Sequence, residues 1–463
     1  MNSLKKAEKT SQARLDLREN ISAVSLPAIA VVFVVFMPFF RTFLPHANAL
    51  SYAAVILLFV AAAFHVVGLG TGIRFYAPFM VLLLFCLYSL LNNSFVSGLS
   101  WFAICGGTAL CMVILANDRV SGWERVALMC IALFGLFYAL ATIVLWIVPD
   151  LYDAYVYPYL SSKTATEETT LTGYKAGLTT NYSTNGMYIA LGLVACFALS
   201  LKGGRTWQVA TLVALFALLL TTKRAHLAFG VAAMAAVYFV WGSQKKAGTF
   251  AKFLGVAALL LLALYIASFF NEDILAVFER FSSLSDDDSF GGRSGFYELC
   301  LSMWGDSPLI GNGWRSFSVE FYKTPESWSY AANGFSAMDA HNVYLQVLAE
   351  EGLVGELLFL VVLVGGIVAA VRRLLLLNEV DAARADGSLK GNRSVVAGAL
   401  MIQLFFAAYC ITGNPLYDIQ MYVPWLFSIG MAYAATPSEV ERELTERRAR
   451  KRAAKRPAVA ARV

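Results

Sequence analysis

Residues 126–148 read VALMCIALFGLFYALATIVLWIV, an apolar run of 23 residues without a charged side chain. As an α-helix, a run of this length crosses the roughly 30 Å of hydrocarbon in a bilayer. The whole 463-residue chain has the same character, because 59% of it is hydrophobic and only 14% is charged, with a mean hydropathy of +0.63. This composition predicts a helical membrane protein and excludes an ordinary water-soluble domain.

Eleven further apolar runs have the length of a membrane span. Together with residues 126–148 they give twelve predicted spans. These are residues 24–43, 49–68, 75–91, 100–116, 126–148, 184–201, 207–222, 225–242, 250–270, 353–371, 394–412 and 419–436. We therefore expect an all-α polytopic membrane protein, with one large and partly helical outer loop between the ninth and tenth spans.

The order of polar and apolar segments divides the chain into five parts. A basic arm covers residues 1–23, nine spans follow in residues 24–270, and a polar segment occupies residues 271–342. A short helix and three further spans fill residues 343–436, and a basic tail covers residues 437–463. The tail is expected to meet solvent or anionic lipid rather than nucleic acid.

The distribution of Lys and Arg predicts which side of the membrane each loop faces. If both termini are cytoplasmic, 27 of the 36 Lys and Arg residues lie in the arm, the tail or the loops of that side. One missed or invented span would exchange the sides of all later loops. The bias therefore supports both the number of spans and an orientation that puts residues 271–342 outside.

Residues 271–342 hold the most unusual polar residues of the chain. They include Gly291-Gly292-Arg293, a glycine-rich turn that ends at Arg315, and the pair His341-Asn342 directly before an apolar helix. The apolar spacing predicts a short amphipathic helix over residues 294–304 and a second one over residues 343–351, which leads into the tenth span. The unusual charges thus gather at the outer membrane surface, and function is expected there.

Three arginines on the outer side are candidate anion ligands: Arg224, Arg293 and Arg315. The planar guanidinium pairs bidentately with phosphate oxygens, and the helix N-terminus expected after Arg293 adds to that preference. A diphosphate at the membrane surface would suit them. Alternatively, Arg224 and its neighbour Lys223 anchor the chain to lipid headgroups, and Arg293 is only a surface charge.

His341 is the candidate general base, because an imidazole accepts protons near neutral pH. It could take the proton of an incoming sugar hydroxyl, with Asp339 orienting the ring. The alternative is a histidine that caps a helix or satisfies a buried carbonyl.

The acidic run Asp286 to Asp288 suggests a cation site at first sight, because hard divalent cations take carboxylates. The run lacks a second acidic cluster at matching spacing, and a solvated loop is the better interpretation. We expect no metal and no cofactor. The aromatic residues between Phe317 and Phe335 could stack on sugar rings or lie at the headgroups.

The motifs of this region resemble the O-antigen ligase and O-antigen polymerase superfamily. The resemblance rests on Gly292-Arg293 followed by Trp304, then SPLIGNG at residues 307–313, HNVYL at residues 341–345 and EGLVG at residues 351–355. Their order and spacing both agree with the family. The upstream match, TKRA at residues 222–225, is weaker, because family members often have a small residue in place of the lysine.

The resemblance implies a bacterial cytoplasmic-membrane enzyme of ligase or polymerase type. It would transfer a glycan from an undecaprenyl-diphosphate carrier to a sugar hydroxyl of a lipid-anchored or lipid-linked acceptor, with inversion at the anomeric carbon. Arg224 and Arg293 would hold the diphosphate and His341 would activate the hydroxyl. Arg315 is a further candidate cation for the diphosphate, and three more residues are candidates for a supporting role. These are Lys223, Asp339 and Asn342.

Two other functions stay open at this point. A transporter of a lipid-linked sugar or a small anion should show a polar cavity that crosses the whole membrane. A transferase needs one cavity, open to the outside and laterally to lipid. A structural partner of a glycan export machinery would not need Arg293 and His341 in one cleft.

Overall fold

The computed structural model describes residues 26–44, 48–69, 73–92, 99–117, 120, 122–160, 173–241, 255, 265, 293–328, 338–384 and 386–455, which are helical and contain no strand. The long helices are α2 (Leu26–Phe43), α3 (Asn48–Leu69), α4 (Ala77–Leu91), α5 (Leu99–Leu115), α6 (Trp123–Ile147), α8 (Tyr182–Ser200), α9 (Arg205–Leu220), α10 (Arg224–Val240), α14 (Ser294–Asp306), α17 (Val343–Arg384), α18 (Lys390–Tyr409), α19 (Ile419–Ala434) and α20 (Ser438–Lys455). The short elements are η3 (Tyr152–Val156), η4 (Tyr157–Tyr159), η5 (Gly173–Ala176) and α15 (Ser316–Phe321).

Eleven of the twelve predicted spans coincide with a helix, and the ninth, residues 250–270, lies outside the described residues apart from Gly255 and Tyr265. Six of the described helices are long and apolar enough to cross a membrane by themselves: α2, α3, α6, α8, α17 and α18. Four shorter apolar helices are α4, α5, α9 and α10. The all-α prediction is confirmed for the described residues, whereas the number of crossings stays a prediction.

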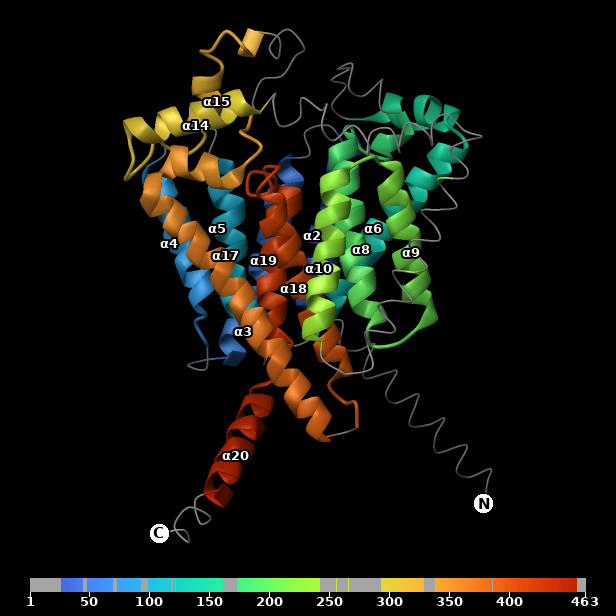
Figure 1. Ribbon diagram of the computed structural model, residues 1–463, viewed down its shortest axis with the longest axis vertical. Helices are drawn as coiled ribbons and strands as arrows, with labels where there is room; N and C mark the ends of the chain where they lie inside the picture. Colours follow the sequence, from blue (N-terminus) through green and yellow to red (C-terminus); the bar gives the residue numbers. More distant parts are fainter. Residues whose placement is uncertain are drawn as a thin grey trace.

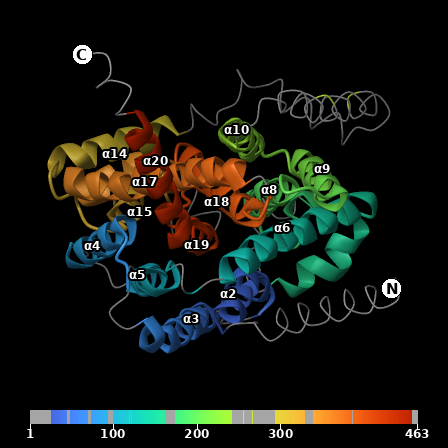
Figure 2. The same ribbon diagram turned by 90° about the horizontal axis from the view of Figure 1, so that it is seen from below.

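The apolar helices stand side by side and form one bundle (Figure 1). Helices α14 and α15, from the polar segment, lie across one end of the bundle, and α20 projects from the opposite end. Seen along the bundle, α18 and α19 lie in its middle (Figure 2). Opposite ends for the polar segment and the basic tail agree with the predicted topology, although the side of the membrane that each end faces stays a prediction.

Helix α8 is deeply enclosed in the bundle, because every residue from Asn185 to Leu199 is buried. It crosses α6 where Gly135 and Gly192 meet, and a Cβ on Gly135 would lie only 2.3 Å from the Cα of Gly192. Small residues let helix backbones approach closely in apolar surroundings. The N-terminus of α8 is thereby fixed at the end of the bundle that carries α14.

Helix α17 changes direction at Gly352, whose φ of 64° and ψ of −169° lie outside the helical region. This is the position between the short helix predicted over residues 343–351 and the tenth predicted span. Beyond it, α17 continues to Arg384 instead of ending near residue 371. Residues 372–384 contain neither Gly nor Pro, so nothing in them stops a helix.

The glycine turn that precedes α15 is hydrogen-bonded to the backbone of α17 at the kink around Gly352. The Gly313 N–H donates to the Glu350 carbonyl at 2.6 Å, and the Leu353 N–H donates to the Pro308 carbonyl at 2.9 Å. Two sequence motifs that lie about 40 residues apart are therefore joined backbone to backbone.

Only glycine fits at the two closest points of this contact. A Cβ on Gly311 would lie 2.3 Å from the Glu350 carbonyl oxygen, and one on Gly352 would lie 2.4 Å from the Leu309 carbonyl carbon. Both glycines also have positive φ, which glycine adopts without steric cost. This junction holds α14, α15 and the start of α17 in one arrangement.

Candidate active site

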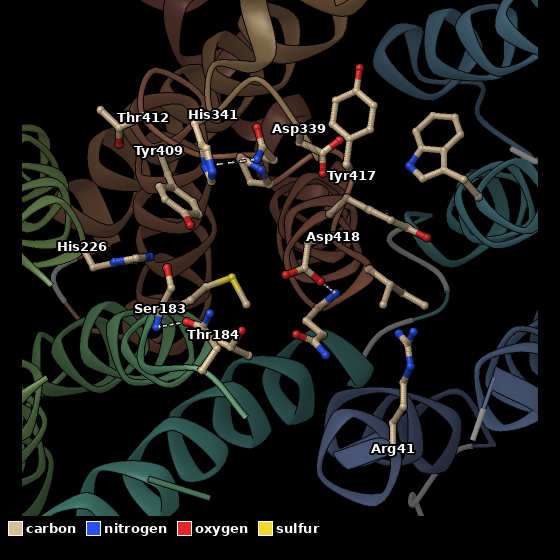
Figure 3. Close-up of a pocket in the computed structure, with 18 of the residues that line it drawn as sticks. Arg41, Ser183, Thr184, His226, Asp339, His341, Tyr409, Thr412, Tyr417 and Asp418 are labelled. Carbon is tan, nitrogen blue, oxygen red and sulfur yellow. Dashed lines mark hydrogen bonds between the residues drawn. The ribbon is translucent and has the colours of Figure 1, made fainter. Parts of the chain in front are cut away.

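A cavity of about 820 Å³ lies at the end of the bundle that carries α14 and α15. Its walls come from the ends of α2, α8, α10, α18 and α19 and from the turns before α14, α15 and α17 (Figure 3). The charged and imidazole side chains among its described lining residues are Arg41, Lys223, His226, Arg293, Arg315, Asp339, His341 and Asp418. Four cations and two carboxylates make this lining positive overall, which suits an anionic ligand.

Five of the seven residues predicted for the site line this one cavity: His341, Arg293, Arg315, Asp339 and Lys223.

The other two predicted residues, Arg224 and Asn342, are not among the described lining residues. Arg224 begins α10, directly after Lys223, so the turn presents the lysine to the cavity. The Asn342 side-chain oxygen accepts the Leu345 N–H at 3.1 Å, which makes it a cap for the first turn of α17.

His341 lies immediately before α17 with a φ of 55°, in the left-handed region. The pKa of His341 is lowered to about 4, first by burial and then by the positive charge of Arg293, while Asp339 opposes the shift and Lys223 adds to it. The imidazole is therefore neutral at physiological pH. A neutral imidazole has the lone pair that a general base requires.

Asn414, in the loop after α18, contacts the ring of His341, with its side-chain nitrogen 3.3 Å from Nδ1. The nitrogen and oxygen of an amide occupy nearly equivalent positions, so a turn of the amide brings Oδ1 to the ring instead. The buried Oδ1 of Asn414 has no hydrogen-bond partner in the first orientation. In the second it would accept the Nδ1–H of His341, which would leave Nε2 to accept a proton.

Asp339, which was expected to orient His341, pairs elsewhere. Its carboxylate accepts from Arg315 Nη1 at 2.8 Å and from Gln346 Nε2 at 3.0 Å. Its charge still acts on His341 by raising the pKa of the ring. Among the hydrogen bonds of the described residues, the partner of the His341 ring is Asn414.

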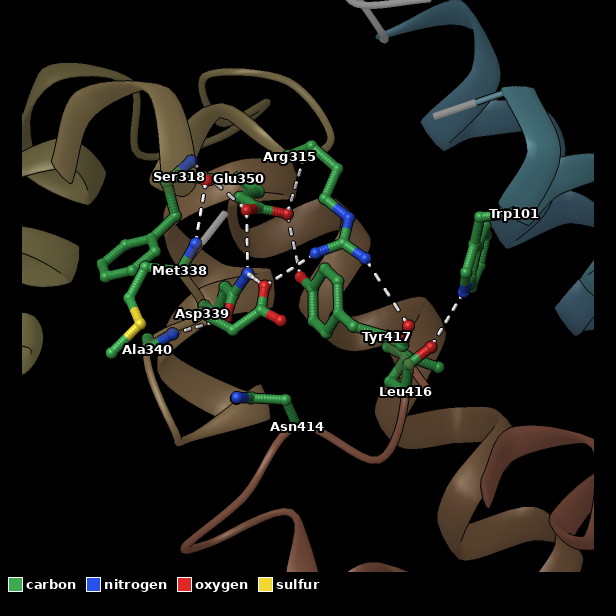
Figure 4. A network of polar contacts seen from close by, with 12 residues as sticks. Trp101, Arg315, Ser318, Met338, Asp339, Ala340, Glu350, Asn414, Leu416 and Tyr417 are labelled. Atoms are coloured by element: carbon green, nitrogen blue, oxygen red, sulfur yellow. Dashed lines mark hydrogen bonds and ion pairs between the residues drawn. The ribbon is translucent and has the colours of Figure 1, made fainter. Parts of the chain in front are cut away.

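Glu350 is the centre of the polar network that holds Arg315 (Figure 4). Its buried carboxylate accepts the Arg315 backbone N–H at 3.0 Å, the Tyr417 hydroxyl at 2.8 Å and Gln346 Nε2 at 3.0 Å. The Arg315 guanidinium lies over the Tyr417 ring, 4.8 Å from its centroid. The network joins the turn before α15, the start of α17 and the loop before α19, so it fixes the position of Arg315.

Arg293 is the residue directly before α14, as the glycine-arginine motif predicts, and Gly291 and Gly292 lie outside the described residues. Its Nη1 donates to the carbonyl of Thr412 at 3.3 Å. That carbonyl belongs to the loop that also carries Asn414. The arginine and the partner of His341 are therefore positioned by the same segment.

Left-handed backbone marks this part of the molecule. Among the described residues, the non-glycine positions with positive φ are Thr222, Arg315 and His341. Arg315 and His341 line the cavity, and Thr222 precedes Lys223, which lines it as well. Such conformations cost free energy and persist where the surrounding structure fixes them, most often at functional sites.

Several lining residues carry no signal in the sequence. Arg41 comes from the last turn of α2, His226 from the first turn of α10, and Asp418 from the cap of α19. Each is one polar residue next to an apolar run, where a headgroup anchor or a helix cap is the ordinary interpretation. Burial raises the pKa of Asp418, whose carboxylate accepts the Gln420 N–H as the cap of α19.

The described residues contain no group of three His, Cys, Asp or Glu side chains that could hold a metal ion. The acidic run Asp286 to Asp288 lies outside the described residues.

The chain was compared with protein families and with curated proteins. Residues 209–360 match the O-antigen ligase family, and a search of curated proteins gives no match to the chain. The matched range contains Lys223, Arg293, Arg315 and His341, together with the two motifs that meet at Gly352. The segment of the chain that holds these cavity residues is thus similar to the O-antigen ligase family.

Proposed function

We propose that this protein transfers a glycan from an undecaprenyl-diphosphate carrier to an acceptor sugar hydroxyl at the outer face of a bacterial cytoplasmic membrane. The observation that carries the proposal is the placement of Arg293, Lys223 and His341 on the wall of one cavity. The three groups are also close enough for both cations to lower the pKa of the histidine.

The reaction needs a base at the nucleophile and positive charge at the leaving group. His341 takes the proton of the acceptor hydroxyl as its oxygen attacks the anomeric carbon of the donor glycan. The bond from that carbon to the diphosphate oxygen breaks, and undecaprenyl diphosphate leaves with the electron pair. One displacement of this kind inverts the anomeric centre.

Arg293 and Lys223 are placed to stabilise the leaving diphosphate, because fixed cations in a cavity act on charge as it develops. The bound diphosphate in turn acts on His341. Its negative charge offsets the two cations that lower the pKa of the free histidine. Substrate binding therefore makes His341 a stronger base when the acceptor is present.

A transporter is the alternative function, and the shape of the cavity argues against it. The charged lining residues come from the α14 end of the bundle. A second, narrow pocket shares Ile419 and Gln420 with this cavity, and it is otherwise lined mainly by apolar side chains of α2, α6, α8 and α19. Within the described residues, the polar lining of the cavity thus gives way to apolar side chains deeper in the bundle, instead of continuing as a polar path across it.

The test compares His341→Ala and Arg293→Ala with the unchanged protein, in a transfer assay with purified protein and undecaprenyl-diphosphate-linked donor. Loss of the general base should lower kcat by about 10² to 10⁴-fold. Arg293→Ala should lower kcat/KM for the donor, with partial recovery in Arg293→Lys. Lys323→Ala is the matched control, because this exposed cation near α15 pairs with Glu320 and does not line the cavity. Transfer retained by both site variants would refute the mechanism.

A further inference from the structure

His226 is a buried histidine whose ring has no hydrogen-bond partner among the described residues. It is 1% exposed, yet it lines the cavity, and neither ring nitrogen has a partner. The ring lies beside Tyr409, with ring centroids 4.5 Å apart (Figure 3). A buried polar group without a hydrogen-bond partner is energetically unfavourable. A ligand in the cavity could supply the missing hydrogen bond.

The wall around His226 is built from two helix N-termini. Helix α8 presents Ser183 and Thr184 to the cavity, and α10 presents Ala225 and His226. The N-terminus of a helix carries partial positive charge, and both of these face the same space. The wall therefore favours an anion before any charged side chain is counted.

Lys223 adds a full positive charge to this wall. It precedes α10, and its Nζ lies 3.7 Å from the centroid of the Tyr182 ring, in the first turn of α8. Gly186 makes this approach possible, because a Cβ there would lie 3.2 Å from the Lys223 side chain. The lysine thus spans the gap between the two helix ends.

We infer that His226, Lys223 and the N-termini of α8 and α10 form a phosphate subsite, in which the neutral imidazole donates a ring N–H to a non-bridging phosphate oxygen. The inference rests on the proposed function, and it divides the diphosphate between two places. One phosphate lies at Arg293 and the other lies at the His226 wall. His226 is then a binding residue for the donor, whereas His341 acts on the acceptor.

The first test uses the histidines as probes, because the chain has only four of them. The full-length protein, labelled with ¹⁵N-histidine and held in lipid nanodiscs, is titrated with inorganic diphosphate and, separately, with undecaprenyl diphosphate. The ring signals of His226, assigned with His226→Gln, should shift with both ligands, and those of His65 on α3 should stay unchanged. A shift with only one of the two ligands would show whether the subsite recognises the free anion or the lipid-linked one.

The responses of His226 and His341 distinguish failure of the phosphate subsite from failure of the proposed function. If diphosphate shifts His341 but leaves His226 unchanged, the His226 subsite is wrong and the cavity remains the diphosphate site. An ordered water as the partner of His226 would give this result. If neither histidine responds, the proposed diphosphate cavity fails as well.

Kinetics of two variants give a second, independent check. His226→Leu removes the donor group and should raise KM for the lipid-linked donor by roughly tenfold or more, since a hydrogen bond to a charged group is lost. His226→Gln keeps an N–H and should stay within a few-fold of the unchanged protein. KM for the acceptor should not change in either variant. Equal losses in both variants, with a lower unfolding temperature, would assign His226 a packing role only.

Discussion

The two ends of the bundle each contain an arginine–aspartate ion pair, and the two pairs differ in how completely they are enclosed. At the α20 end, the Arg393–Asp381 side chains are 11% and 7% exposed. At the α14 end, the Arg315–Asp339 side chains are 26% and 23% exposed, and they line the cavity. An arginine and an aspartate therefore form a buried ion pair at the α20 end and a partly exposed ion pair in the cavity wall at the α14 end.

The sealed pair has a partner for each guanidinium nitrogen. Arg393 donates to Asn378 through Nε, to Asp381 through Nη1 and to the Trp241 carbonyl through Nη2, and its guanidinium stacks over the Trp241 ring. Asp381 accepts in addition the Leu389 N–H. This network joins α10, α17 and α18, and it leaves these groups nothing with which to bind a ligand.

The cavity at the other end shows the opposite pattern. His226, Thr412 and Asn414 line it, and each has buried polar atoms without a hydrogen-bond partner among the described residues. Buried polar groups in folded proteins are nearly always paired, so such a concentration calls for a ligand or for water. Unsatisfied polar atoms, more than charge alone, distinguish the functional end of this molecule from the structural one.

The largest expected effect is on the free energy of unfolding. It is tested by replacing the aspartate of each ion pair with alanine. Asp381→Ala leaves Arg393 buried without its carboxylate and should lower the free energy of unfolding by about 3–5 kcal/mol. Asp339→Ala should cost about 1 kcal/mol or less, because water screens a pair that is a quarter exposed. Unfolding in detergent by denaturant titration measures both variants.

The same two variants should reverse their order in the transfer assay. Asp339→Ala frees Arg315 from its position in the cavity, so transfer should fall about tenfold. The folded fraction of Asp381→Ala should transfer at the rate of the unchanged protein. Equal stability losses in the two variants would contradict the distinction between a structural and a functional pair.

The sequence predicts the helices of the bundle well, because each helix depends on interactions within its own segment of the chain. Each apolar run must satisfy its own backbone hydrogen bonds in hydrocarbon, so its length alone indicates a helix. The kink of α17 is also local in origin, since it lies at Gly352, the glycine of a recognised motif. What the sequence does not show is that this glycine faces Gly311 across a backbone contact.

The site is predicted only where its residues stand out from their surroundings. Arg293, Arg315 and His341 lie in the one long polar segment, where they were candidate site residues, and the structure brings them to one cavity. Arg41 and His226 each adjoin apolar runs, and only the packing of α2 and α10 brings them to the same space. The choice between Lys223 and Arg224 depends on the left-handed Thr222, a backbone feature that residue type does not specify.

A smaller effect concerns the pH dependence of transfer. The pKa of free His341 is about 4, so the base form is present above that pH and is lost as the pH falls through it. The acid limb of kcat/KM, which reports the free enzyme, should therefore lie near pH 4, and the limb of kcat should lie higher, because bound diphosphate raises the pKa. An acid limb at the ordinary histidine pKa in both profiles would contradict the lowering of the His341 pKa by burial and by the neighbouring cations.

Two substitutions should move this acid limb in opposite directions. Lys223 lowers the pKa of His341, so Lys223→Met should shift the limb to higher pH, though burial and Arg293 keep it below the ordinary histidine value. Asp339 raises that pKa, so Asp339→Asn should shift the limb to lower pH. The quantity to measure is the pH of the acid limb and not the absolute rate of transfer. The rate is not informative, because Lys223→Met also weakens the proposed phosphate subsite.

The smallest effect is expected at the acidic run Asp286 to Asp288, which the sequence does not pair with a second acidic cluster. A divalent cation needs several oxygen ligands around one point. Changing each Asp to Asn should leave transfer within about twofold of the unchanged protein, as for an ordinary surface substitution. Transfer should also persist in EDTA, because we propose Arg293 and Lys223, which line the cavity, as the cations that stabilise the diphosphate. Loss of transfer in EDTA that Mg²⁺ restores, and that the Asp→Asn variants reproduce, would place a metal at this run and would reassign part of the leaving-group stabilisation from the arginine and lysine to that ion.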